Sequence, residues 1–447
     1  MGLAVLAVGS VLAMGSYTLD RIVILQLAMV FGSASLTFLF QCPQAGLALL
    51  LVGGILVRQE IATGTHTGLH GAVLMSAVLI AVWLVHHVFE RERHGQVFSR
   101  TIVPLNLFMV TALLAFLVGQ YPWFPVPPAS LSAQLGQLAI FLFSGGLFLV
   151  AAHYLQDTRW LKGIAYFFIG AGSIHLAFRL LPGLLSSLGA FLPDAVTRGS
   201  MFWTWLVALS AGQAIMNREL RLIPRLTMAA VALTAIFIGL TQLRTWVSGW
   251  FPPVLSVLVI LLLRFPIPIL AAAPAIVFLS LLSAGYFTDL ATAGDNLYSY
   301  ETRVAAMKSL FPLLAANPVL GLGPANYYHY TLLYPILGWY IKFNSHNNYL
   351  DLIGQTGLVG LALFLWFACA VLRTAWKHRS QAKEGFERAY VYSVLAGLFA
   401  TLVAAALGDW VIPFIYNTGF PGFRTSILPW VFMGGLIALE QRLRRRA

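Results

Sequence analysis

Runs of apolar residues, most of them about 20 residues long, alternate with short polar segments along the whole chain. A helix of that length crosses the hydrocarbon core of a bilayer, which is roughly 30 Å thick. The pattern predicts fourteen membrane spans, with twelve as the alternative count, since the short early runs and the pair around Arg264 are barely long enough to cross separately. The predicted spans are residues 2–22, 22–40, 43–58, 69–89, 102–120, 136–155, 161–182, 200–217, 222–241, 250–264, 266–285, 351–374, 389–408 and 424–441.

One connection is much longer than the others. It covers residues 286–350, between the eleventh and twelfth predicted spans, and this length is typical of a functional lid or a small packed subdomain. From Thr302 onward, apolar side chains recur at helical spacing, which predicts a surface helix with one face resting on the bundle and Arg303 pointing elsewhere. That predicted face consists of Val304, Met307, Leu310, Phe311 and Leu314.

Composition leads to the same fold class. Hydrophobic residues make up 59% of the chain and charged residues only 9%, whereas a soluble domain carries roughly 25% charged residues. This excludes soluble, disordered, fibrous and nucleic-acid-binding folds. The chain is therefore expected to be an all-α polytopic membrane protein, a helical bundle with one large extracytoplasmic loop that contains short surface helices.

The net charge of +12 indicates orientation rather than an acidic partner. With a cytoplasmic N-terminus, 18 of the 27 Lys and Arg residues fall in cytoplasmic segments, as the positive-inside rule requires. Both termini are then cytoplasmic. The apolar run from Met1 lacks a basic n-region, so it is interpreted as a span and not as a signal peptide. The remaining cations, on the outer half, are Arg21, Arg58, Arg179, Arg198, Arg244, Arg303, Lys308, Lys342 and Arg424.

Three parts of the chain follow from this organisation. Residues 1–240 form an N-terminal transmembrane bundle. Residues 241–374 form a module that contains the outer loop, and residues 375–447 form C-terminal transmembrane helices with a basic cytoplasmic tail.

The end of the outer loop carries a candidate catalytic group. His346 stands among amides in Asn344-Ser345-His346-Asn347-Asn348, directly before a span that opens with Gly354 and Gly357. A histidine at the membrane interface, followed by residues that permit close helix approach, is accessible to a lipid-linked substrate. The alternative is a polar helix cap, with Asn or Ser as the N-cap residue.

A glycine pair precedes this segment, in Leu320-Gly321-Leu322-Gly323-Pro324. A dinucleotide-binding loop would need a preceding strand and a following helix, whereas here no strand precedes the glycines and Pro324 interrupts the helix start. The pair instead predicts a tight turn that ends the surface helix.

Two outer arginines depart from the charge rule. Arg244 follows the ninth predicted span, and Arg303 lies near the start of the surface helix. A guanidinium stays charged in a site of low dielectric and offers a planar fork of donors, which suits a pyrophosphate. The alternative for each is snorkelling at the interface or a structural ion pair.

Four further polar residues are accessory candidates. His175 and Arg179 share a helix face near the outer end of the seventh predicted span, where a helix-to-helix hydrogen bond is equally consistent with the sequence. Asn347 adjoins His346. Asp409 lies in a second outer loop that also approaches Arg424, and that loop either lines the substrate site or is structural.

The outer module resembles the signature region of the O-antigen ligase and O-antigen polymerase superfamily. The resemblance extends from Thr241 to Leu361. The residues that carry it are Arg303, Pro318, Gly321, Gly323, Asn326, His346, Asn347, Leu350, Gly357 and Gly360. Members are polytopic, GT-C-like glycosyltransferases of the cytoplasmic membrane. They move a glycan from an undecaprenyl pyrophosphate carrier to an acceptor on the outer side.

The resemblance implies a role for each of three residues. The family's essential histidine corresponds to His346, and the arginine that opens its surface helix corresponds to Arg303. An earlier family arginine, usually in a Ser-Arg-Gly context, corresponds to Arg244, which here lies between Leu243 and Thr245. The arginines would hold the donor pyrophosphate, and His346 would take the proton of the acceptor hydroxyl.

Several further expectations follow from the resemblance. Asp289, Asp295 and Glu301 are scattered, so transfer is expected to need no metal and no other cofactor, and to invert the anomeric centre. The acceptor is a lipid A core, another carrier-linked glycan or a protein side chain, which correspond to ligase, polymerase and protein glycosylation. The alternative from a different functional class is a transporter of lipid-linked sugars. Transporter folds usually consist of two similar halves, and this chain shows no such halves. A scaffold subunit would leave the outer arginines unexplained.

Overall fold

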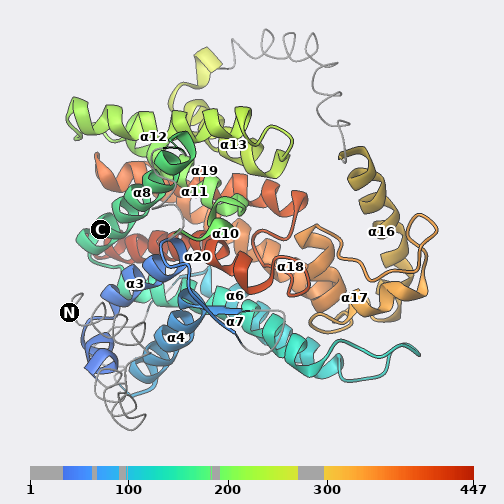
Figure 1. Ribbon diagram of the computed structural model, residues 1–447. Coiled ribbons are helices and arrows are strands. Elements are labelled where there is room, and N and C mark those ends of the chain that lie inside the picture. Colours follow the sequence, from blue (N-terminus) through green and yellow to red (C-terminus); the bar gives the residue numbers. More distant parts are fainter. Residues whose placement is uncertain are drawn as a thin grey trace, which may run out of the picture.

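The computed structural model describes residues 34–62, 68–89, 97, 99–181, 183, 192–269 and 296–446 (Figure 1). Its elements up to residue 180 are a helix over Ala34–Gln41, then α3 (Pro43–Ile55), β1 (Glu60–Ala62), β2 (Gly68–His70), α4 (Gly71–Phe89), α6 (Ile102–Val118), α7 (Leu131–Tyr154) and α8 (Thr158–Leu180). The later elements are α10 (Asp194–Thr197), α11 (Ser200–Met216), α12 (Leu222–Thr241), α13 (Val247–Arg264), α16 (Asn296–Ala316), α17 (Tyr327–Tyr330), η1 (Thr331–Leu333), α18 (Asn348–His378), α19 (Phe386–Leu407) and α20 (Gly419–Arg446).

The expected all-α polytopic membrane fold is confirmed. Among the described residues, eight helices are long and apolar enough to cross a membrane, or nine if the bent pair Ala34–Gln41 and α3 forms one span. The shorter apolar helix α6 and the buried helix α11 coincide with two further predicted spans. The predicted spans 2–22, 22–40 and 266–285 lie wholly or mostly outside the described residues, so the count of fourteen stays a prediction.

Helix α20 lies at the centre of the bundle (Figure 1). It packs most extensively against α7 and also contacts α11 and α19. Its residues from Phe423 to Leu439 are all buried, because apart from Arg424 this segment is apolar or small on every side, as a helix surrounded by other helices must be. The core is therefore built around the C-terminal span.

The predicted surface helix of the outer loop is α16, which lies beside α17 and α18 (Figure 1). Its buried face differs partly from the prediction. Leu310 and Leu314 are buried as expected, but Met307 and Phe311 are exposed, with 38% and 60% of their surface accessible. Leu313 is buried instead, because residues 310, 313 and 314 form the stripe that meets Tyr327 and Tyr330.

Arg424, in the segment predicted to be either substrate-lining or structural, has a structural role. Its guanidinium is fully buried and donates to four backbone carbonyl oxygens of residues 53–58, which end α3. It also pairs with Glu60 at 3.1 Å. A single side chain thus satisfies the carbonyl groups that a helix C-terminus leaves without partners.

Candidate active site

A buried hydrogen-bond network holds the loop that carries His346 in place. Ser345 Oγ donates to Asp351 Oδ1 at 2.6 Å, and the Tyr327 hydroxyl contacts the same oxygen. Tyr327 also lies 2.7 Å from Asn344 Oδ1. All four side chains are buried. Because Asp351 belongs to the first turn of α18, the network ties the loop to the start of that helix.

Asn347 is the N-cap of α18, as the alternative interpretation of this segment expected. Its Oδ1 accepts hydrogen bonds from the backbone N–H groups of Tyr349, at 2.9 Å, and Leu350, at 3.3 Å. Its amide group donates to the carbonyl of Ala406. Asn347 therefore fixes where the helix begins, while the adjacent His346 adopts a backbone φ of +49°, which is uncommon for a residue other than glycine.

The imidazole of His346 faces the loop between α19 and α20. Its Nδ1 lies 3.2 Å from Asn417 Nδ2, and the same Asn417 amide donates to Asp409 Oδ1 at 2.7 Å. Since a carboxylate only accepts, the NH2 end of Asn417 faces both groups and Nδ1 of His346 is an acceptor. A neutral ring then carries its proton on Nε2.

Asp409 is a buried carboxylate with a full set of donors. Besides Asn417, the Thr418 hydroxyl donates to Oδ2 at 2.8 Å and the backbone N–H of Phe414 at 2.9 Å. Only 1% of the residue is accessible. The carboxyl group of Asp409 is therefore held in one orientation beside the Asn417 amide that contacts His346.

Arg303 interacts electrostatically with His346 and Asp409. Burial lowers the pKa of His346 most, the Asp409 charge opposes this by raising it, and the Arg303 cation lowers it further. For Arg303, loss of solvent lowers the guanidinium pKa, whereas Asp409 raises it. The structure therefore brings together three predicted residues, from α16, from the loop before α18 and from the loop after α19.

An aromatic group borders this cluster. The rings of Tyr328 and Tyr416 stack with centroids 4.7 Å apart, and His329 Nε2 lies 3.2 Å from the Tyr416 hydroxyl. Burial, followed by the Lys342 charge, lowers the pKa of His329. Sequence reasoning missed these residues, as it missed Asn417, because Tyr and Asn in outer loops have no readable spacing relative to His346.

The predicted turn around Gly321 and Gly323 is present and fills a break in α18. Gly357 interrupts that helix with φ +70° and ψ −173°. On one side of the break, the N–H groups of Leu322 and Gly323 donate to the carbonyls of residues 354 and 355. On the other side, the N–H groups of Leu358 and Val359 donate to the carbonyls of Pro318 and Val319. The turn thus satisfies the backbone groups that the break exposes.

The other predicted site residues lie apart from this cluster. Arg244 is exposed in the turn between α12 and α13, and its carbonyl accepts from Trp250 Nε1 at 3.1 Å. The same turn reaches the Asp409 loop through Trp246 and Trp410, whose ring centroids are 5.5 Å apart.

His175 and Arg179 make local structural bonds. His175 Nε2 contacts the carbonyl of Ile55 at 2.8 Å, and Arg179 donates to Thr197 Oγ1 at 3.1 Å. These contacts are with the end of α3 and with α10, in agreement with the alternative of a helix-to-helix hydrogen bond.

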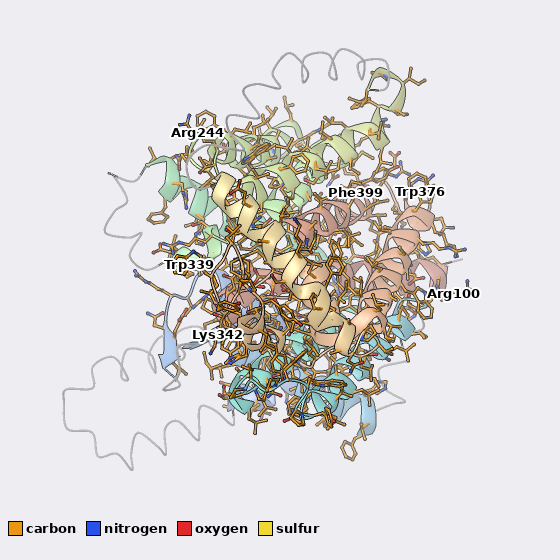
Figure 2. All side chains as sticks on the ribbon, turned by 90° about the vertical axis from the view of Figure 1, so that its right-hand side faces the viewer. Arg100, Arg244, Trp339, Lys342, Trp376 and Phe399 are labelled. Carbon is orange, nitrogen blue, oxygen red and sulfur yellow. The ribbon has the colours of Figure 1, made fainter. Side chains whose placement is uncertain are left out.

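The two ends of the bundle are separated in Figure 2. Arg244, Trp339 and Lys342 lie on one side of this view, and Arg100 and Trp376 lie on the opposite side. Arg244 and Lys342, which are predicted to lie on the outer half, are thus on the side opposite Arg100, which is predicted to be cytoplasmic. Among the described residues, no three His, Cys, Asp or Glu side chains gather as a metal site would require.

Comparison with known families gives one match. Residues 225–365 fit the family model described as O-antigen ligase. The resemblance to the O-antigen ligase superfamily is confirmed. The O-antigen ligase match contains Arg244, Arg303 and His346, whereas Asp409 and Asn417 lie beyond it. The match and the apolar helices together support a multi-pass membrane enzyme of the O-antigen ligase or polymerase type. No curated protein is significantly similar to the chain.

Proposed function

We propose that the protein transfers a glycan from an undecaprenyl pyrophosphate carrier to an acceptor hydroxyl. The observation that carries this proposal is the convergence of Arg303, His346 and Asp409 at the start of α18, in and beside the O-antigen ligase match. The reaction would take place on the outer face of the cytoplasmic membrane, with both chain termini on the cytoplasmic side. It would invert the anomeric centre and use cationic side chains in place of a metal.

The donor pyrophosphate would bind to the arginines. Arg303 is near enough to His346 to lower the pKa of its imidazole, and its guanidinium would stabilise the charge that grows on the leaving phosphate as the glycosidic bond breaks. Arg244 is exposed on a turn that contacts the Asp409 loop through Trp246, and it would meet the outer phosphate or the entering carrier. The stacked pair Tyr328 and Tyr416 provides flat apolar faces of the kind that pack against sugar rings.

His346 would receive the proton of the acceptor hydroxyl. The neighbouring cation and burial both lower its pKa, so the ring is neutral near pH 7 and able to accept a proton. In the resting arrangement Nε2 carries the ring proton. The lone pair that can accept a proton is therefore on Nδ1, and the acceptor hydroxyl would replace the exposed Asn417 amide as the hydrogen-bond partner of that atom.

Substitution of Arg303 tests the electrostatic part of this proposal. We expect Arg303→Gln to lower kcat/KM by about 100-fold, because a charged hydrogen-bond donor to the pyrophosphate is lost. The same change removes a cation that disfavours protonation of His346, so the pKa of His346 rises. Activity requires the neutral ring, and the acidic limb of the pH–rate profile should therefore move to higher pH.

Two variants control this measurement. Arg303→Lys keeps the positive charge and should leave the acidic limb in place, although a point charge replaces the planar fork. Lys308→Gln removes a cation from the exposed face of the same helix and should change neither rate nor profile. An unchanged profile in Arg303→Gln would show that Arg303 does not act on the proton-transfer group.

The acceptor is decided by product analysis. Purified protein is given one undecaprenyl pyrophosphate glycan, with a truncated lipid A core, with a second carrier-linked unit, or with a Ser- or Thr-containing peptide. Transfer of the whole glycan to the core indicates a ligase, and growth of the carrier-linked chain indicates a polymerase. Movement of the intact donor across liposomes without bond cleavage, and no transfer to any acceptor, would contradict the proposed function and favour transport.

A further inference from the structure

A large cavity lies at the opposite end of α18 from His346. Its volume is about 1210 Å³, and it is bounded by the start of α6, the C-terminal part of α18 and the end of α20. His346 precedes the first residue of α18, whereas the cavity begins near Trp366 and extends to Lys377. The cavity is therefore separate from the candidate active site.

The face of α18 that lines this cavity changes from apolar to cationic along the helix. Trp366, Cys369 and Ala370 are followed by Arg373 and Lys377, at spacings of three or four residues that place them all on one side of the helix. From α6, Ile102 and Val103 extend the apolar part. The cavity thus has an apolar end towards the middle of the helix and a cationic end at its terminus.

Three cations of this cavity are not neutralised by the described residues. Arg100, Arg373 and Lys377 are exposed and pair with no acidic side chain in the described part of the chain. The one carboxylate in the lining, Glu440, is 4% exposed and already bonded to Ser99 Oγ at 2.7 Å and to Arg444 at 2.6 Å. The surplus charge of the cavity is positive.

Figure 2 places Arg100 on the same side of the molecule as Trp376, a half-exposed tryptophan near the end of α18. Tryptophans are enriched at the boundary between the hydrocarbon core and the lipid headgroups. Arg379 lies over the face of Trp376 at 3.7 Å, as expected for a cationic side chain near that boundary. In a bilayer whose boundary lies at this tryptophan, the cationic end of the cavity would be at headgroup level and the apolar end at the level of the acyl chains.

We propose that this cavity binds an anionic phospholipid of the adjacent leaflet. The phosphate would contact Arg100, Arg373 and Lys377, and an acyl chain would lie along Trp366 and Cys369. A free phosphate would use only the cationic end and leave the apolar surface of Trp366 uncovered, whereas a zwitterionic lipid would not match the surplus charge. The order of apolar and cationic groups along α18 thus fits a phospholipid with net negative charge.

The test removes the three cations together. In detergent-solubilised full-length protein, the variant Arg100→Gln/Arg373→Gln/Lys377→Gln should bind dioleoylphosphatidylglycerol about 100-fold more weakly than the parent protein, because each cation contributes roughly 1 kcal/mol to binding of an anionic lipid. Bound lipid is counted by native mass spectrometry. The variant Arg221→Gln/Lys383→Gln/Arg445→Gln removes three exposed cations outside the cavity and should bind as the parent does.

A second measurement reports the position of the lipid. Cys369 is exposed in the cavity lining, and in a Cys42→Ser background it is the remaining thiol. Dioleoylphosphatidylglycerol should slow its alkylation by N-ethylmaleimide, and the cavity variant should lose this protection. Equal protection by phosphatidylcholine, protection by glycerol phosphate alone, or unchanged protection in the cavity variant would each overturn the proposal.

Discussion

Transfer activity is expected to fall by about 10³-fold when His346 is replaced with alanine, a loss within the range for removal of a general base. The reason is that the proton of the acceptor hydroxyl then has no acceptor beside Arg303 and Asp409. The measurement is the rate of glycan transfer from an undecaprenyl pyrophosphate donor under saturating acceptor. His87→Ala, on α4, removes another half-buried histidine and should leave the rate unchanged.

The backbone conformation of His346 makes a second variant necessary. Its φ of +49° disfavours alanine, so loss of activity in His346→Ala alone would not separate chemistry from loop conformation. Asparagine tolerates this conformation and cannot accept a proton near neutral pH. We expect His346→Asn to be as inactive as the alanine variant. An active asparagine variant would show that position 346 serves the loop and not proton transfer.

The largest expected loss of stability comes from Gly357→Ala. The conformation of Gly357, φ +70° and ψ −173°, is essentially restricted to glycine, and an added Cβ would clash with the Val319 carbonyl oxygen. We expect unfolding to become easier by about 3–4 kcal/mol, seen as a lower midpoint of thermal unfolding in detergent. Transfer activity should fall as well, since the turn that fills the break leads into α17, whose Tyr327 holds the His346 loop.

Gly170→Ala is the matched control for this variant. Gly170 lies within α8, and a Cβ there meets no atom within 4 Å. Alanine favours helix by up to about 1 kcal/mol relative to glycine, so this variant should be neutral or slightly more stable. If Gly357→Ala proved equally harmless, the break in α18 would not depend on glycine.

The sequence predicts the fold well because hydrophobic runs directly encode membrane helices. Every predicted span that falls within the described residues coincides with a helix, and α16 was predicted from its spacing of apolar residues. Its buried face was predicted less well. Periodicity alone does not distinguish the side that packs on Tyr327 and Tyr330 from the side that carries Phe311.

The candidate site was predictable only in part. Arg303 and His346 were identified through the family resemblance, and Asp409 as a polar residue in an outer loop. Asn417, which bonds to both His346 and Asp409, was missed because it lies 71 residues from His346 in the chain. No local pattern connects residues at that separation. The same holds for Arg424, which the structure shows to be a cap for α3, 366 or more positions away.

The filled break in α18 has a consequence for how enzymes of this type can diversify. Residues 318–323 are anchored to the break, and Asn347 and Asp351 anchor the other end, so the intervening segment starts and finishes on the same helix. Such a segment can gain, lose or exchange residues around its exposed tip at Trp339 without moving the spans. If the proposed function holds, residues that contact the acceptor could therefore change in this segment without a change in the membrane-spanning helices.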